Sequence, residues 1–82
     1  MNVYKNSIPL KDLPVGKIGE VAQITSDGAI RRRFLDLGLT PSTIVKTERI
    51  SPLGNPIAFN IRGTVIALRK EEAANILVNI LK

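Results

Sequence analysis

The chain has 82 residues, of which 44% are hydrophobic and only 4% aromatic, and it carries a net charge of +5. This length is enough for one domain, so residues 1–82 are expected to form a single domain. The absence of histidine and cysteine excludes disulfides, the usual zinc, copper and iron ligand sets, and catalysis by a histidine base or a Ser-His or Cys-His pair. We therefore expect no enzyme activity, metal site or cofactor, and a protein that works by binding a partner.

The first regular element is expected to be a strand. The two prolines of Asn6–Pro14 indicate an irregular lead-in, and the pattern of Lys17–Thr25 then predicts a strand. Strict alternation along that strand would place Val21 and Ile24 on opposite faces.

A helix is expected near residues 28–37. Asp27 is suited to be its N-cap, and the apolar residues Ile30 and Phe34 are four positions apart. Gly38 follows where a left-handed residue commonly ends a helix. The pattern therefore predicts a helix with Ile30 and Phe34 on its buried face.

Three more strands are predicted in the second half of the chain. Thr43–Ser51 and Ile57–Ile61 are joined by the turn-rich loop Pro52–Pro56, and Val65–Arg69 follows the tight turn Arg62-Gly63-Thr64. Along the middle strand, Ile57, Phe59 and Ile61 should face inward, and Ala58, Asn60 and Arg62 outward.

The C-terminal segment carries overlapping helical and strand patterns. We favour a short helix over Lys70–Asn75, with Glu71 and Glu72 at its positive end, and then a closing strand over Leu77–Lys82.

Together these elements predict a mainly β fold. It would be a small, partly open barrel of about five short strands, with a helical insertion near 28–37 and a short C-terminal helix near 70–76. The core should be aliphatic, with the aromatic members Phe34, Phe59 and Tyr4. The expected turn and cap positions are Gly16, Gly19, Asp27, Gly38, Pro41, Gly54 and Gly63.

The sequence predicts neither a secretory signal nor a membrane helix. Residues 1–9 lack the apolar stretch of a signal peptide, and the longest apolar segment, Ile76–Leu81, is far too short to span a bilayer. We expect a cytoplasmic protein. Its net positive charge favours an acidic partner, which could be nucleic acid, anionic lipid or an acidic protein surface.

Two segments are candidates for partner binding. Arg31-Arg32-Arg33 is the densest charge run; it is either a contact for an acidic partner or the solvated face of the helix, where Arg32 could pair with Asp36. The loop Pro52–Pro56 is either a plain connection or presents Leu53, with Asn55 beside it, as an exposed contact.

Several motifs occur in a characteristic order. They are Leu13-x-x-Gly16-x-x-Gly19-x-Val21-x-x-Ile24, the run Arg32–Pro41, the loop Pro52–Pro56, Arg62-Gly63, and Ala67–Lys70 with Glu72-Ala73-x-x-Ile76-x-Val78. In this order and spacing the chain resembles the FeoA family over essentially its whole length. One departure is Ser42, where the family often has glycine after the proline.

The resemblance implies an SH3-like barrel and a role in bacterial ferrous iron uptake. Proteins of the family are small cytosolic accessories that act with the membrane transporter FeoB, whose cytosolic part carries a GTP-binding domain. The family is often described as metal-binding, but the side chains of this sequence are poorly suited to hold ferrous iron. We expect iron specificity to reside in the transporter.

The leading hypothesis is an accessory protein that binds the cytosolic GTPase part of a FeoB-type transporter and reaches the membrane only through it. Arg31, Arg32 and Arg33 would supply charge complementarity, and the loop around Leu53 and Asn55 would supply apolar contact. The alternatives are a basic nucleic-acid-binding barrel, disfavoured by the scarcity of aromatic residues, and a metal-responsive regulator module.

Overall fold

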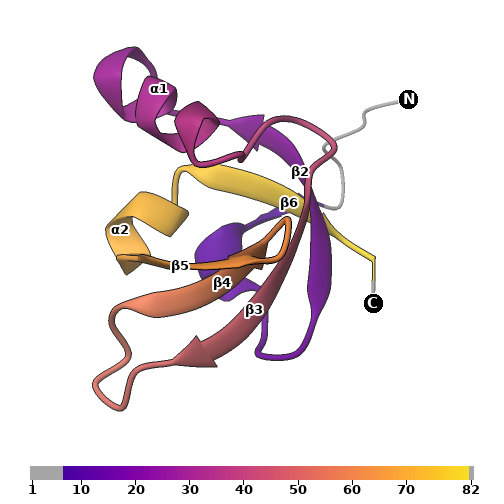
Figure 1. Cartoon of the computed structure of the whole chain (residues 1–82), viewed down its shortest axis with the longest axis vertical. Coiled ribbons are helices and arrows are strands. Elements are labelled where there is room, and N and C mark those ends of the chain that lie inside the picture. Colours follow the sequence, from indigo (N-terminus) through magenta and orange to yellow (C-terminus); the bar gives the residue numbers. More distant parts are fainter. Residues whose placement is uncertain (1–6, 82) are drawn as a thin grey trace.

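The computed structural model describes residues 7–81 (Figure 1). Its elements are β1 (Ser7–Pro9), the 3₁₀ helix η1 (Leu10–Asp12), β2 (Ile18–Ile24), α1 (Gly28–Asp36), β3 (Ile44–Ile50), β4 (Ile57–Ile61), β5 (Thr64–Leu68), α2 (Lys70–Ala73) and β6 (Ile76–Ile80). The strands form one antiparallel sheet in the order β1-β6-β2-β3-β4-β5.

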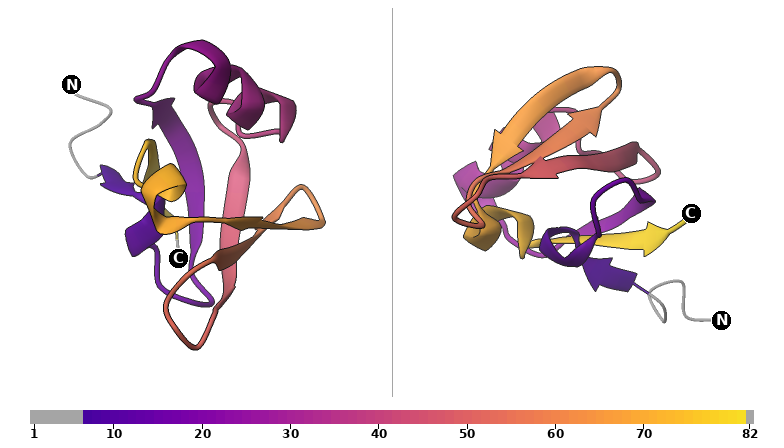
Figure 2. Two further views of the ribbon diagram at one scale, coloured as in Figure 1. Left: turned by 90° about the vertical axis from the view of Figure 1, so that its left-hand side faces the viewer. Right: turned by 90° about the horizontal axis from the view of Figure 1, so that it is seen from below.

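The sheet curls into a partly open barrel. Strands β3, β4 and β5 fold over β1, β6 and β2, and α2 lies where β5 turns back toward β6 (Figures 1 and 2). The end strands β1 and β5 do not pair with each other. The predicted mainly β, partly open barrel is therefore confirmed.

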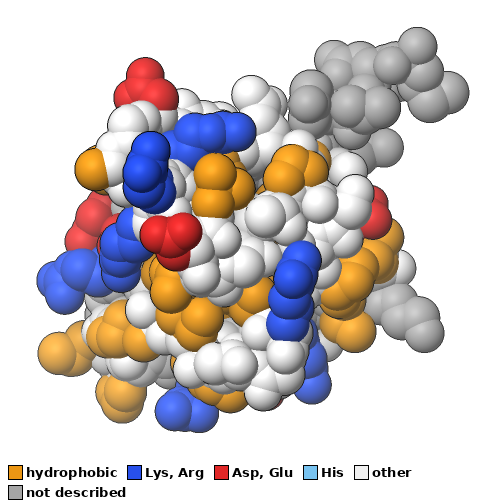
Figure 3. All heavy atoms as spheres, turned by 45° about the horizontal axis from the view of Figure 1, so that its top comes forward, with side chains coloured by type: hydrophobic (Ala, Val, Ile, Leu, Met, Phe, Trp, Pro, Cys, Tyr) orange, Lys and Arg blue, Asp and Glu red, His pale blue; other side chains and the backbone are white. Residues whose placement is uncertain are grey.

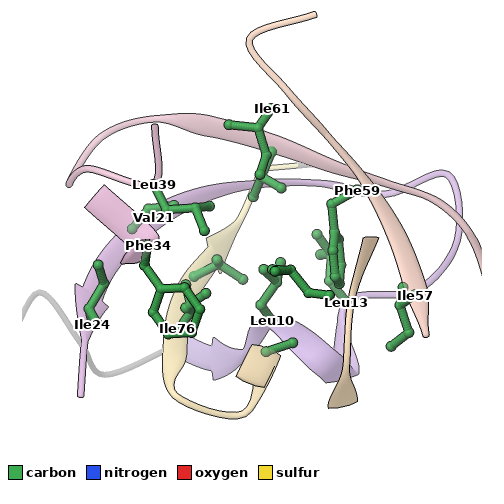
Figure 4. Packing of buried hydrophobic residues seen from close by; sticks show 14 residues of the cluster. Leu10, Leu13, Val21, Ile24, Phe34, Leu39, Ile57, Phe59, Ile61 and Ile76 are labelled. Carbon is green, nitrogen blue, oxygen red and sulfur yellow. The ribbon is translucent and has the colours of Figure 1, made fainter. Parts of the chain in front are cut away.

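An aliphatic core fills the barrel. Its side chains come from both layers of the curled sheet, from η1 and from both helices, and they point toward one another (Figure 4). Phe34 and Phe59 are fully buried, as predicted, whereas Tyr4 lies outside the described residues. The buried members are Leu10, Leu13, Val21, Ile24, Phe34, Leu39, Val45, Ile57, Phe59, Ile61, Leu68, Ala73, Ile76 and Val78.

The described chain has a sixth strand that the sequence did not predict. β1 lies within the expected irregular lead-in and pairs with β6, with Ser7 opposite Asn79 and Pro9 opposite Leu77. The Ser7 hydroxyl also donates a hydrogen bond to Asn79 Oδ1 at 2.8 Å. Because β1 is an edge strand, proline is tolerated in it. Its only strand partner is some 70 residues away, so local sequence gives no signal for it.

A bulge changes the expected alternation of β2. The register with β6 shifts between Val21 and Gln23, and Val21 and Ile24 are both buried. The prediction that they lie on opposite faces was wrong, because a bulge adds one residue and moves the following side chains to the other face.

Two further burial predictions were wrong. Ile30 is 54% exposed, and Phe34 is the one buried residue of α1. The helix lies at one end of the barrel (Figure 1) and packs on the core through Phe34 and the partly buried Leu35. Ala58 was expected to face outward but is buried between Arg49 of β3 and Ala67 of β5.

The predicted helix followed by a strand at the C-terminal end is confirmed, but both elements end earlier in the chain than predicted. The helix ends at Ala73 rather than Asn75, and the closing strand is Ile76–Ile80 rather than Leu77–Lys82. Glu71 and Glu72 lie in the first turn of α2, as predicted.

Most predicted turn residues occupy turns. Gly38 follows α1 with φ +95°, and Arg62 and Gly63 form the β4–β5 turn with φ values of +54° and +86°. Gly16 and Gly54 also have positive φ, and Pro41 lies in an exposed turn. Gly19 has a different role, because a Cβ there would lie 3.2 Å from Val78 Cβ across the sheet.

The predicted N-cap of α1 is only partly correct. Asp27 occupies the N-cap position with extended backbone angles, but its side chain makes no capping hydrogen bond. Its backbone carbonyl accepts a 3.5 Å hydrogen bond from the Arg31 amide.

Thr47 supplies a buried hydrogen bond that can be tested. Its side chain is fully buried, and its hydroxyl donates to the Leu13 carbonyl at 2.9 Å. Thr47→Val should cost about 1–2 kcal/mol in the free energy of unfolding, because that carbonyl would lose its side-chain donor. Urea unfolding measures this directly.

The matched control is Thr25→Val. The Thr25 hydroxyl also donates to a carbonyl, that of Asn75, but the site is exposed and the carbonyl keeps the Thr25 amide as donor. A change within about 0.5 kcal/mol is expected there. Equal losses in the two variants would contradict the role given to Thr47.

Candidate partner-binding surface

The three arginines of α1 have different surroundings. Arg31 Nη1 donates to the Ile24 carbonyl at 3.2 Å, and Arg33 pairs with Glu72 of α2. Arg32 makes no hydrogen bond or ion pair within residues 7–81, so the predicted pair with Asp36 is not formed there. We call Arg31, Arg32 and Arg33 the α1 basic cluster; of its members, Arg32 keeps its charge most available.

The α1 basic cluster borders a shallow hollow on the surface of the helix. Its volume is about 760 Å³, and its lining residues are Gly28, Ala29, Arg31, Arg32, Leu35 and Asp36. Lys and Arg side chains gather over α1 (Figure 3, upper left). This arrangement favours contact with an acidic group.

Glu72 connects α1 to α2. One carboxylate oxygen accepts the Arg69 backbone N–H at 2.9 Å, which caps α2, and the other accepts from Arg33. The Arg69 amide and then the Arg33 guanidinium lower the pKa of Glu72 below its ordinary value of 4.5. The sequence placed Glu72 at a helix start, but Arg33 is 39 residues away and gave no local signal.

The lowered pKa of Glu72 predicts an acid-sensitive contribution to stability. A group with a depressed folded-state pKa stabilises the fold above its unfolded pKa, near 4.5, and this stability is lost as the pH falls through the folded value. Glu72→Gln should lower the free energy of unfolding by about 0.5–1 kcal/mol at pH 7, because the amide oxygen can still accept the Arg69 N–H but the negative charge that Arg33 and the start of α2 stabilise is lost. The substitution should also make the free energy of unfolding fall less steeply below pH 4.5, which urea unfolding at several pH values measures.

Glu48→Gln is the charge-matched control for this series, because Glu48 has no ion pair within the described residues. Its free energy of unfolding at pH 7 should stay within about 0.5 kcal/mol of the wild-type value. An unchanged acid limb in Glu72→Gln would rule out the proposed coupling.

The loop between β3 and β4 presents an apolar side chain to solvent. Leu53 is 96% exposed. The loop around it is ordered by backbone hydrogen bonds from Gly54 to Ser51 at 2.7 Å and from Ser51 to Pro56 at 3.2 Å. Leu53 is therefore accessible to a partner, and its role as an apolar contact rather than part of a plain connection stays a prediction.

Asn55 has an internal partner. Its Oδ1 accepts the Lys70 backbone N–H at 3.0 Å, and a Cβ on Gly54 would lie 3.5 Å from Lys70 Nζ. Asn55 therefore fixes the loop to the start of α2. Lys70, which no sequence motif indicated as a binding residue, adds a positive charge beside Gly54, the residue after Leu53.

The two predicted binding segments do not adjoin. α1 and the β3–β4 loop lie at opposite ends of the longest axis, with α2 between them (Figures 1 and 2). Each is tied to α2, through Arg33 with Glu72 and through Asn55 with Lys70. A partner that contacts both segments must extend along the side that carries α2.

The donor set does not fit a transition metal. No group of three or more His, Cys, Asp or Glu side chains is brought together within residues 7–81, and the sequence has neither His nor Cys. Scattered carboxylates are poor ligands for ferrous iron or zinc. In the same part of the chain, neither helix is long and apolar enough to cross a membrane.

Comparisons with protein-family models and with solved structures both match this chain to FeoA proteins. The FeoA domain model matches residues 8–80. The solution structure of the FeoA protein of Chlorobium tepidum is 39% identical, with a TM-score of 0.85 over 92% of this chain and 71% of that one. Stenotrophomonas maltophilia FeoA, solved with zinc and described as a procaryotic SH3 domain protein, is 28% identical, with a TM-score of 0.76 over 85% of this chain and 87% of that one.

A curated relative places the same domain in a longer protein. The Fe(2+) transport protein A/Fe(2+) transporter FeoB fusion protein of Porphyromonas gingivalis is 26% identical over 72 residues, which is 88% of this chain and 8% of that protein. This chain thus spans a small part of that relative. The FeoA domain model matches nearly the whole length of this chain, and the barrel is SH3-like, as in the FeoA structures. The chain therefore belongs to the FeoA family, which is linked to ferrous iron transport.

Proposed function

We propose that this protein is a cytoplasmic accessory of ferrous iron uptake that binds the cytosolic GTPase part of a FeoB-type transporter. It acts by binding rather than catalysis, as a single domain, and associates with the membrane only through this partner. Iron is the cargo of the transporter, not a ligand of this chain.

The observation that carries the proposal is the fusion protein of Porphyromonas gingivalis, in which an FeoA-like segment and FeoB share one chain. Covalent linkage keeps two modules at a high effective concentration, which is useful when the modules bind each other. A separate chain of the same family would make the same contact in trans.

The described surface supplies two kinds of contact for such a partner. The α1 basic cluster, with Arg32 free of ion pairs among the described residues, would steer an acidic surface toward the protein. Leu53 would supply an apolar anchor that is already ordered by its loop. Preorganisation of this kind lowers the entropic cost of binding.

Isothermal titration calorimetry with the cytosolic part of a FeoB-type transporter tests the proposal. We expect saturable binding with a dissociation constant in the micromolar range, and no heat of binding at tens of micromolar protein would contradict it. Arg32→Ala should weaken binding several-fold and reduce its dependence on salt. Lys17→Ala, an exposed cation away from α1, should leave binding unchanged.

A further inference from the structure

A second hollow lies on the outer face of the sheet, outside the surface described above. Its volume is about 570 Å³, and the residues that line it include Ile18, Ile44, Lys46, Glu48, Asn60 and Arg62. Strand pairing fixes its floor, because Ile18 lies opposite Lys46 and Lys46 lies opposite Asn60. Ile44, on the same face two residues before Lys46, is 47% exposed.

Arg62 is held in place at the rim of this hollow. Its Nη2 donates to the hydroxyls of Thr40 and Thr43, both at 3.2 Å, and those hydroxyls lie 2.8 Å apart. These partners are neutral, so they orient the guanidinium without cancelling its charge. Within residues 7–81, the donors on Nε and Nη1 have no partner, so they remain available to a carboxylate.

Two lining residues have unfavourable backbone conformations. Ser42 has φ +73° and Arg62 has φ +54°, and they are the only non-glycine residues with positive φ in the described part of the chain. Such conformations cost free energy in an L-residue and tend to occur at functional sites. A turn of this kind favours Asn-Gly over Arg-Gly, so the arginine is not explained by the turn itself.

We infer that this hollow, the Arg62 cleft, binds an extended acidic segment of a protein partner. Lys46 and Arg62 supply two positive charges against the single negative charge of Glu48, while Ile18 and Ile44 supply apolar contact. Residues two apart in an extended chain project to the same side. The segment would therefore place a carboxylate over Lys46 or Arg62 and an apolar side chain two residues away over Ile44.

The inference adds a second contact for the proposed transporter partner, and to that extent it rests on the proposed function. The Arg62 cleft and the α1 basic cluster are formed by different residues. The two can therefore be disabled separately.

The test uses the full chain and a synthetic peptide, Ser-Val-Ser-Glu-Ser-Val-Ser-Glu-Ser, acetylated and amidated at its ends. Its matched control replaces both glutamates with glutamine. In ¹H–¹⁵N spectra at low salt, the acidic peptide should shift the amides of Ile18, Ile44, Lys46 and Gly63, with half-saturation at about 1 mM or below. The glutamine peptide should have at least a fivefold weaker effect.

The decisive variant is Arg62→Asn, because asparagine suits the left-handed turn and the hairpin should be retained. It should reduce the affinity for the acidic peptide at least fivefold, as should Lys46→Gln, while Arg32→Gln should not. Thermal unfolding of Arg62→Asn verifies that the fold is intact.

Three results would overturn the inference. They are no shift of the cleft amides at millimolar acidic peptide, equal binding by wild type and Arg62→Asn, or stronger shifts of the same amides by oligo-dT, which would indicate a nucleic-acid surface. The titration does not involve the transporter. Its failure and the failure of the calorimetric test are therefore distinguishable.

Discussion

Leu53→Asp is expected to weaken binding to the cytosolic part of a FeoB-type transporter by about 30-fold or more. Leu53 is 96% exposed and lies on an ordered loop. As an apolar anchor it would carry a central share of the interface free energy, about 2 kcal/mol or more. The aspartate would also place a negative charge against an acidic partner. Calorimetry or surface plasmon resonance measures the change in dissociation constant.

The free energy of unfolding provides the internal check on this variant. Because the Leu53 side chain contacts so little of its own protein, Leu53→Asp should change stability by no more than about 0.5 kcal/mol. Val15→Asp is the matched control, since Val15 is 53% exposed in the turn before β2, belongs to neither proposed contact surface and should not affect binding. Wild-type affinity in Leu53→Asp would remove the loop from the interface, whatever the partner.

Phe34→Ala is expected to cost about 3–5 kcal/mol in the free energy of unfolding, the largest loss from any substitution considered. Phe34 is fully buried and is the one buried residue of α1, while Leu35 packs against the core only in part. A domain of this size has a total stability of only about 4–12 kcal/mol. The variant should therefore populate unfolded molecules at room temperature, which circular dichroism and urea titration measure.

Ile30→Ala on the same helix gives the contrast. Ile30 is more than half exposed, so its truncation should cost less than about 1 kcal/mol, and alanine favours a helix. If the two variants lost similar stability, α1 would be held by its whole apolar stripe rather than by Phe34 alone. The binding prediction depends on this point, because Phe34 anchors the helix that carries the α1 basic cluster.

The elements of the candidate surface could be predicted from local sequence, but their arrangement could not. The arginine run and the Pro-Leu-Gly-Asn-Pro loop were recognisable because charge runs and turn-forming residues act over a few positions. That both segments are joined to α2, through Glu72 and Lys70, depends on contacts between residues 15 and 39 positions apart. Asn55, selected as a contact residue, is engaged by the Lys70 amide.

The Arg62 cleft was not predicted at all. Arg62 was recognised only as part of a hairpin turn, and its orientation depends on Thr40 and Thr43, about 20 residues earlier. The residues that line the cleft come from the neighbouring strands β2, β3 and β4, and the register between these strands, including the bulge in β3, determines which side chains meet. Local periodicity identifies a strand and its buried face, but not which strand lies beside it.

The sequence by itself determined the chemical character of this protein. The lack of histidine and cysteine excludes the usual metal sites, and the aliphatic composition with regularly spaced turns predicts a small β barrel that binds a partner. Both conclusions follow from composition and short-range stereochemistry. Only the tertiary structure decided which charges are neutralised and which stay available. Within residues 7–81, Arg33 forms an ion pair, Arg32 forms none, and Arg62 is oriented by neutral hydroxyls. Pairing depends on distances that only the folded chain establishes.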